Sequence, residues 1–305
     1  MASVYLNGAL IVQYGGGMDS VTHQQVSDSA YTEFTVRIDN ATNVTWGPTS
    51  SPNVLAVHVD GSYGTEHWYA GAGLYRSVHL EHTALMHLDA GLLYFPAVVQ
   101  LNDSTAAGET ALATLQPSVG VTNDSTAGGA ALGVTVAVQL MDATGSQIGA
   151  QVTTNTTAKP GGVTTLVMPP SLVVRNATLW SIQNPYVYTI QTRVSETKTG
   201  LLLDAVNTTV GVRVARFDAQ KGFFLNGQNV KLRGFCHHDD FTGVGMAMPD
   251  RAWLLRAMQS RGVGANSLRT SHNNYRTAVY CKLQSICQLS SNFSIESADS
   301  MENCP

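Results

Sequence analysis

The sequence predicts a mainly β protein made of antiparallel sandwiches, followed by a short segment in which strands and a helix alternate. Up to about residue 214, short runs alternate apolar and polar residues or are rich in β-branched residues, and clusters of Gly, Asn, Asp, Pro and Ser separate them. No helical pattern lies between these runs, which favours antiparallel sheets packed as sandwiches. After Gly211 the pattern changes to strand, helix and strand.

The expected strands of the first part share β-branched and alternating residues, and they lie at 34–38, 54–59, 77–80, 133–140 and 186–194. The stretch 101–131 differs from them, because it is rich in Thr, Ala, Gly and Asp. This composition is typical of a surface loop, so we expect it to decorate one edge of a sandwich.

The later segment predicts a parallel β/α unit. Residues 230–235 and 265–270 are strand-like, and residues 251–260 between them carry apolar side chains at helical spacing. Pro249 precedes this helix and Gly262 ends it. A strand, helix and strand of this length indicate the opening of a doubly wound sheet or of a (β/α)8 barrel.

Charge and hydropathy exclude several classes of partner. The 305 residues include 17 Lys and Arg against 21 Asp and Glu, which gives a net charge of −4, and the basic residues form no cluster. Nucleic-acid and membrane-surface partners are therefore not expected. The longest apolar stretch, 130–141, is shorter than the ~20 residues of a membrane-spanning helix. Because only 12% of residues are charged, neutral polar groups or attached sugars must keep the protein in solution.

The sequence holds eight Asn-X-Ser/Thr sequons, at Asn40, Asn43, Asn102, Asn123, Asn155, Asn176, Asn207 and Asn292. Its 17 Asn and its Ser and Thr content would give about three by chance. The excess indicates a glycoprotein of secretory-pathway or extracellular lineage, although a Thr-rich composition also inflates the number. Residues 1–30 lack the basic and apolar regions of a signal peptide. We therefore expect that export has been lost or that the N-terminus of the full protein lies upstream.

Several motifs in a fixed order match those of a known family. They are VYLNG (4–8), YTEF (31–34), NVLAVHVD (53–60), WYAGAGLYR (68–76), LWS (179–181), NPYVY (184–188), GVR (211–213), GFFLNG (222–227), LRGFCHHDD (232–240) and NSLRTSHN (266–273). In order and spacing they resemble motifs of glycoside hydrolase family 2, which includes β-galactosidases, β-glucuronidases and β-mannosidases.

The resemblance implies three domains. A partial jelly-roll sugar-binding domain is expected at 1–82, an immunoglobulin-like β-sandwich at 86–213 and the start of the (β/α)8 catalytic barrel at 214–275. Residues 276–305 resemble nothing in the family, and we expect them to be an unrelated, disordered tail. Family members begin several strands earlier and their barrels continue further, so we expect a fragment truncated at both ends.

The resemblance implies hydrolysis of terminal β-galactosides or related β-glycosides, with carbohydrate as the partner and no organic cofactor. Retaining hydrolysis needs two carboxyl groups about 5–5.5 Å apart. In the family both are glutamates late in the barrel, one of them in an Asn-Glu pair, and 214–275 contains no such pair. We therefore expect no catalytic residue here and an inactive chain. The alternatives are a non-catalytic carbohydrate-binding or adhesive β-sandwich protein, and an interaction scaffold with an exposed apolar patch.

Four residues are candidate substrate contacts by resemblance. His238 matches a family histidine that faces the sugar, and Arg269 and His272 match residues that border the same pocket, where barrel strands end. Arg269 is equally suited to bracing carboxylates inside a barrel. His67 stands where family members carry a residue that reaches toward the active site, and a loop histidine without function is an equal alternative.

No metal site is expected. The cysteine spacings match no zinc module, and in the run 237–240 only His238 and Asp240 share a strand face, which leaves two ligands at most. Cys236 replaces a family Asn, and we expect a buried or inert thiol there rather than a nucleophile.

Overall fold

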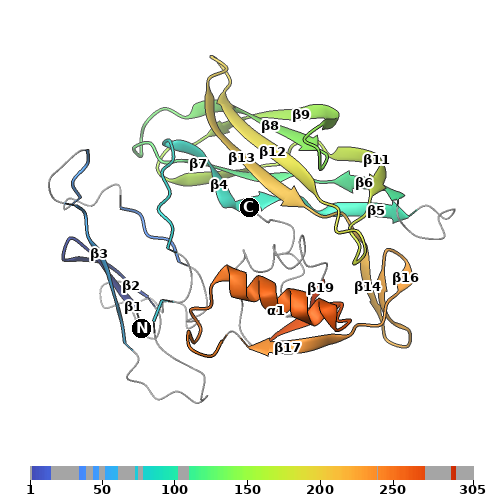
Figure 1. Ribbon diagram of the computed structural model, residues 1–305. Helices are drawn as coiled ribbons and strands as arrows, with labels where there is room; N and C mark the ends of the chain where they lie inside the picture. The colour runs from blue at the N-terminus through green and yellow to red at the C-terminus, as the bar shows by residue number, and fades with distance from the viewer. Residues whose placement is uncertain are drawn as a thin grey trace. The chain divides into compact units, whose positions relative to one another are not determined.

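The computed structural model describes residues 2–14, 34–38, 44–47, 52–60, 73–74, 78–101, 110–238, 240–271 and 290–292. Contacts divide the chain into two compact units, each described by itself below (Figure 1). Unit 1 comprises Met1–Val78, His238–Pro249 and Thr270–Arg276, and unit 2 comprises His79–His237, Asp250–Arg269 and Thr277–Pro305. Within the described ranges, no helix has the length and apolar character needed to cross a membrane.

The described part of unit 1 contains an antiparallel sheet, with strands in the order β2-β1-β3. The strands are β1 (Ala2–Leu6), β2 (Ala9–Tyr14) and β3 (Leu55–Val59). Asn7 and Gly8 join β1 to β2 with positive φ angles of 49° and 84°, as a two-residue hairpin turn requires. The Asn7 side chain also accepts a hydrogen bond from the Val54 backbone N–H at 2.7 Å, which holds the start of β3 against this turn.

The larger part of unit 2 is a β-sandwich of two layers (Figure 1). One layer is a four-stranded sheet in the order β13-β12-β8-β9, and the other consists of two three-stranded sheets, β10-β7-β4 and β11-β6-β5. Their bounds are β4 (Met86–Tyr94), β5 (Ala97–Leu101), β6 (Thr110–Leu115), β7 (Ser118–Asn123), β8 (Leu132–Met141), β9 (Gln147–Ala158), β10 (Val163–Val167), β11 (Leu172–Thr178), β12 (Tyr188–Glu196) and β13 (Leu202–Val210).

Prolines explain why the second layer is broken into two sheets. Pro96 lies between β4 and β5, Pro117 between β6 and β7, and Pro169 and Pro170 between β10 and β11. Each strand of one sheet thus continues into a strand of the other after a short break. Because proline has no backbone N–H to give to a ladder, all three strands interrupt their pairing at corresponding places.

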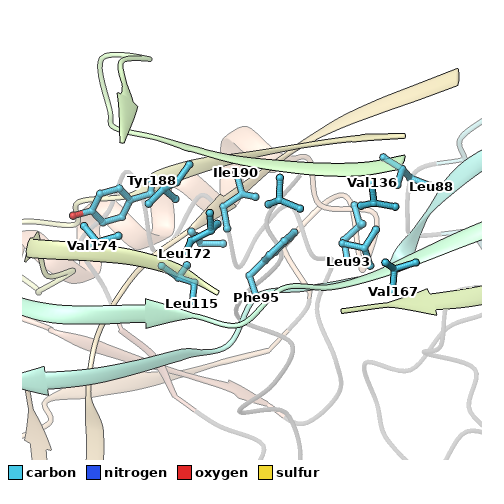
Figure 2. Packing of buried hydrophobic residues seen from close by; sticks show 14 of the residues in the cluster. Leu88, Leu93, Phe95, Leu115, Val136, Val167, Leu172, Val174, Tyr188 and Ile190 are labelled. Carbon is cyan, nitrogen blue, oxygen red and sulfur yellow. The ribbon is translucent and has the colours of Figure 1, made fainter. Parts of the chain in front are cut away.

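Apolar side chains from both layers form one core. In β8, alternate residues from Val134 to Leu140 are buried, as the alternating sequence predicts. Figure 2 shows Phe95 and Leu115 from one layer and Val136 and Ile190 from the other filling the space between the sheets. The strands expected at 54–59, 133–140 and 186–194 are confirmed as β3, β8 and β12.

Three sequence-based expectations about strands were wrong. Residues 34–38 and 78–80 belong to no strand. The stretch 101–131 is not a surface loop, because it contains β6 and β7, and Ala113 and Val121 in these strands are fully buried. Small residues on an inward face allow the opposite layer to approach closely, so the same composition suits a core strand.

Unit 2 continues in a small antiparallel sheet that is fastened to the end of the sandwich. Its strands are β14 (Ala215–Asp218), β15 (Gly222–Leu225) and β16 (Gln228–Asn229). Asn226 is buried and donates from Nδ2 to the Trp180 carbonyl at 3.0 Å, while its Oδ1 accepts from the Val214 N–H at 3.0 Å. Trp180 in turn packs with Phe223 and Leu225.

A strand, a helix and a further strand follow, as expected. They are β17 (Gly234–His238), α1 (Asp250–Gly262) and β18 (Ser267–Ser271), with β19 (Ser290–Asn292) parallel to β18. A Cβ at Gly234 would lie 2.3 Å from the Ser267 carbonyl oxygen, so β17 and β18 approach each other too closely for any side chain there. Gly234 faces Ser267 and Cys236 faces Arg269, hence the two strands run in the same direction. The strands begin two to four residues later than predicted, while the helix is confirmed.

We predict that Asn226→Ala lowers the free energy of unfolding by about 1–3 kcal/mol, because the Trp180 carbonyl and the Val214 N–H both lose their side-chain partner in a buried place. Chemical denaturation measures this loss. Asn226→Gly is the matched variant, since glycine tolerates the φ of 50° but has no amide. A glycine variant as stable as the parent would show that the amide contributes nothing.

Candidate functional site

The four predicted substrate contacts occupy different parts of the chain. His238 ends β17 and is half-buried in unit 1, whereas Arg269 lies on β18 in unit 2 with an exposed side chain. His67 and His272 lie outside the described residues. No pair of the four therefore forms a site within one unit of the described chain.

The side chains of β17 alternate between two faces. Cys236 points to the same side as the guanidinium of Arg269, whose Nη1 lies 3.7 Å from the Cys236 sulfur. Cys236 is exposed and carries a free thiol, so of the two expected states, buried or inert, the structure excludes the buried one. A thiol at this distance is a weak acceptor for the guanidinium.

The opposite face of β17 carries His237, which packs against α1. Its Nε2 lies 3.2 Å from the Ser260 hydroxyl, and its ring is 6.3 Å from that of Trp253. Burial lowers the pKa of His237, and the nearby positive charge of Arg256 lowers that pKa further. The imidazole is therefore neutral at neutral pH.

The pair formed by His237 and Ser260 resembles a base beside a nucleophile, but its place in the fold argues against that chemistry. Ser260 is only 6% exposed, so its hydroxyl is not open to a substrate. The contact instead fixes α1 on β17. Sequence analysis missed it, because a helix residue and a strand residue 23 positions apart meet only through the rotation of the helix.

The described residues also include carboxylates that are used by turns. Asp218 accepts hydrogen bonds from the backbone N–H groups of Lys221 and Gln220, and these bonds, followed by that from Arg216, lower its pKa. Asp142 closes the turn between β8 and β9 by accepting from Thr144 and Ser146, which likewise lowers its pKa. Across the ranges that the structure describes, no three His, Cys, Asp or Glu side chains gather as a metal site would require.

We predict that the chain becomes less stable as the pH falls below 6.5, the ordinary pKa of histidine, because His237 has a lower pKa in the folded state. Below pH 6.5 the histidine of the unfolded chain becomes protonated while that of the folded chain stays neutral. The free energy of unfolding therefore decreases until the pH reaches the lowered pKa of the folded state. Thermal unfolding across this interval measures it. His237→Gln does not titrate there and should flatten the profile, while parallel profiles for the two proteins would contradict the assignment.

The sandwich matches a known family. The model of glycosyl hydrolases family 2 matches residues 103–213, which run from just before β6 to just after β13. The match therefore covers most of both layers of the sandwich.

Relatives extend the likeness beyond the sandwich. A β-galactosidase of Bacteroides ovatus is 33% identical over 73% of this chain and 24% of its own length, and a β-glucuronidase of Bacteroides fragilis is 28% identical over 68% and 28%. The crystal structure of a β-glucuronidase from Bacteroides uniformis has a TM-score of 0.75 at 25% identity and covers 95% of this chain and 32% of that one. The chain thus spans about a quarter of the length of the curated relatives it matches. With its sandwich matched to the family model and its sequence and fold shared with these glycosidases, 73% of this chain matches a fragment of glycosyl hydrolase family 2.

Proposed function

We propose that this chain supplies the sandwich scaffold and the first barrel strands of a β-glycoside hydrolase that acts on terminal β-galactosides or β-glucuronides. The observation that carries the proposal is the shared fold with the Bacteroides uniformis β-glucuronidase over 95% of the chain. The B. ovatus relative, a β-galactosidase, supports the same class of substrate. A β-linked sugar is therefore the proposed partner.

In this proposal β17, α1 and β18 are the opening of the (β/α)8 barrel. The parallel course of β17 and β18 and the helix between them support this reading. His238 and Arg269 then lie near the carboxyl ends of neighbouring strands, where barrel enzymes hold their substrates. His238, Arg269, His272 and His67 remain the proposed sugar contacts, because their positions in the sequence resemble those of sugar-facing residues in the family.

We further propose that residues 1–305 do not hydrolyse glycosides on their own. The reaction needs one carboxyl group as acid and a second as nucleophile, both at the anomeric carbon. No glutamate occurs between Glu196 and Glu296, which leaves 214–275 without any. The described Asp218 is engaged by three backbone and side-chain donors of its own turn and is unsuited to either role.

We predict that the purified chain releases no nitrophenol from aryl β-galactoside or aryl β-glucuronide above the buffer background. General acid catalysis alone contributes typically 10² to 10⁴ in rate, so loss of both carboxyl groups removes measurable turnover. The B. ovatus β-galactosidase in the same assay is the positive control.

Two results would separate this proposal from its alternatives. Turnover that His238→Ala or Arg269→Ala abolishes would show that the chain is itself an enzyme. Saturable binding of a β-galactoside or β-glucuronide without turnover, lost in the same variants, would favour a carbohydrate-binding protein. Isothermal titration calorimetry with methyl glycosides measures that binding directly.

A further inference from the structure

Four sequons lie where the structure describes the asparagine side chain, and they fall into two classes. Asn155, Asn176 and Asn207 are exposed, whereas Asn123 is only 2% exposed. The exposed three lie on β9, β11 and β13, which are all edge strands of their sheets, and Asn123 lies on β7, the central strand of its sheet. From this division we propose that Asn155, Asn176 and Asn207 are N-glycosylation sites and that Asn123 is not.

Both polar atoms of the Asn123 side-chain amide are hydrogen-bonded within the fold. Its Nδ2 donates to the Ala158 carbonyl at 3.1 Å, and its Oδ1 accepts from the backbone N–H of Ser125 at 3.1 Å. Because Nδ2 is the atom that carries the glycan, a sugar there would have to occupy the buried space around this hydrogen bond. The Asn-Asp-Ser sequence at Asn123 therefore serves to form the turn after β7 and is not a glycosylation site.

Asn155 and Asn207 present free amide nitrogens on the outer face of the four-stranded sheet. Core residues alternate with them along β9 and β13, where Val152 and Val206 pack against the core. The Oδ1 of Asn155 accepts from the Thr135 hydroxyl at 2.8 Å and that of Asn207 from the Gln191 amide at 3.4 Å. These bonds hold each side chain through its oxygen, and neither Nδ2 makes a hydrogen bond within the described chain.

A β-bulge exposes Asn176. The pairing of β11 with β6 shifts between Val174 and Ala177, so Arg175 and Asn176 stand opposite a single residue. Asn176 has a φ of 55°, which asparagine adopts more readily than most residues, and both bulge residues are exposed. Its amide makes no hydrogen bond within the described chain.

The edge strands β9, β11 and β13 carry few charged residues that could prevent pairing with another chain. An exposed edge strand offers unpaired N–H and C=O groups to other chains, and proteins usually block such edges with charges or proline. β9 contains no charged residue, and β11 contains only Arg175. β13 contains only Asp204, which accepts a hydrogen bond from the Leu88 N–H at 2.9 Å. Glycans on the outer faces of these strands would exclude a second chain by bulk and hydration.

The modification is a glycosyl transfer. Nδ2 attacks C1 of the first sugar of a lipid-linked oligosaccharide diphosphate, the new C1–Nδ2 bond forms as the C1–O bond to the diphosphate breaks, and the amide loses one proton. The hydroxyl of the third sequon residue, Thr157, Thr178 or Thr209, completes the recognition signal. The proposal is independent of any glycosidase activity and requires only that the chain enters the secretory pathway.

The test is expression of residues 1–305 behind a cleavable signal peptide in eukaryotic cells, with glycopeptide mass spectrometry of microsomal and secreted chains. We expect sugar on Asn155, Asn176 and Asn207 in both fractions, and none on Asn123 in the secreted fraction. Thr157→Ala, Thr178→Ala and Thr209→Ala should each remove the sugar from one site, and the matched Thr→Ser variants should retain it. Unmodified Asn155, Asn176 and Asn207 in microsomes, or a glycan on Asn123 in the secreted protein, would overturn the assignment.

A second readout tests the purpose of the glycans. The variant with all three Thr→Ala changes should lose its monomer peak in light scattering, whereas the triple Thr→Ser variant should stay monomeric. Equal self-association of the two triple variants would refute the idea that glycans protect the strand edges. The assignment of the glycosylation sites would still be decided by mass spectrometry.

Discussion

Neutral amide groups hold the segments of this chain together at its turns. Asn7 bonds to Val54, Asn123 to Ala158, Asn226 to Trp180 and Val214, and Asn266 to the Arg233 N–H and the Lys231 carbonyl. An amide both donates and accepts, so one side chain satisfies backbone groups of two segments without the cost of burying a charge. This explains how a chain with only 12% charged residues orders many strands. The rest of the architecture depends on these contacts, because they fix the places where strands begin and end.

The sheet periodicity could be predicted from the sequence, and the less regular strands could not. Alternation along β8 and β12 identifies both strands, since every second side chain enters the core. The same reasoning fails for β6, because two of its inward positions hold the small residues Ala111 and Ala113 while the larger apolar Leu112 lies between them, so the sequence does not alternate. Residues 34–38 show the opposite error, since a β-branched run alone does not make a strand without a partner to pair with.

For the candidate site, sequence analysis placed strand ends but not their surroundings. Arg269 lies on β18 within the predicted strand 265–270, whereas His238 ends β17 beyond the predicted strand 230–235. The contact between His237 and Ser260, by contrast, depends on how α1 is rotated against β17, and no local pattern encodes that rotation. The exposure of Cys236 could not be predicted either, because exposure at a strand face depends on what covers it.

The order of strands in the four-stranded sheet has a consequence for synthesis on the ribosome. β8–β9 and β12–β13 are hairpins of neighbouring strands, and each forms on the order of microseconds once its residues are free. The two hairpins join through the pairing of β8 with β12. This pairing cannot form until β10 and β11 have been synthesised and have crossed to the other layer. At ordinary elongation rates this delay is on the order of seconds, and throughout it the inner edge of β8 is open. The emerging chain is therefore most vulnerable to chaperone capture or mispairing at β8, which the finished sheet pairs on both edges with β9 and β12.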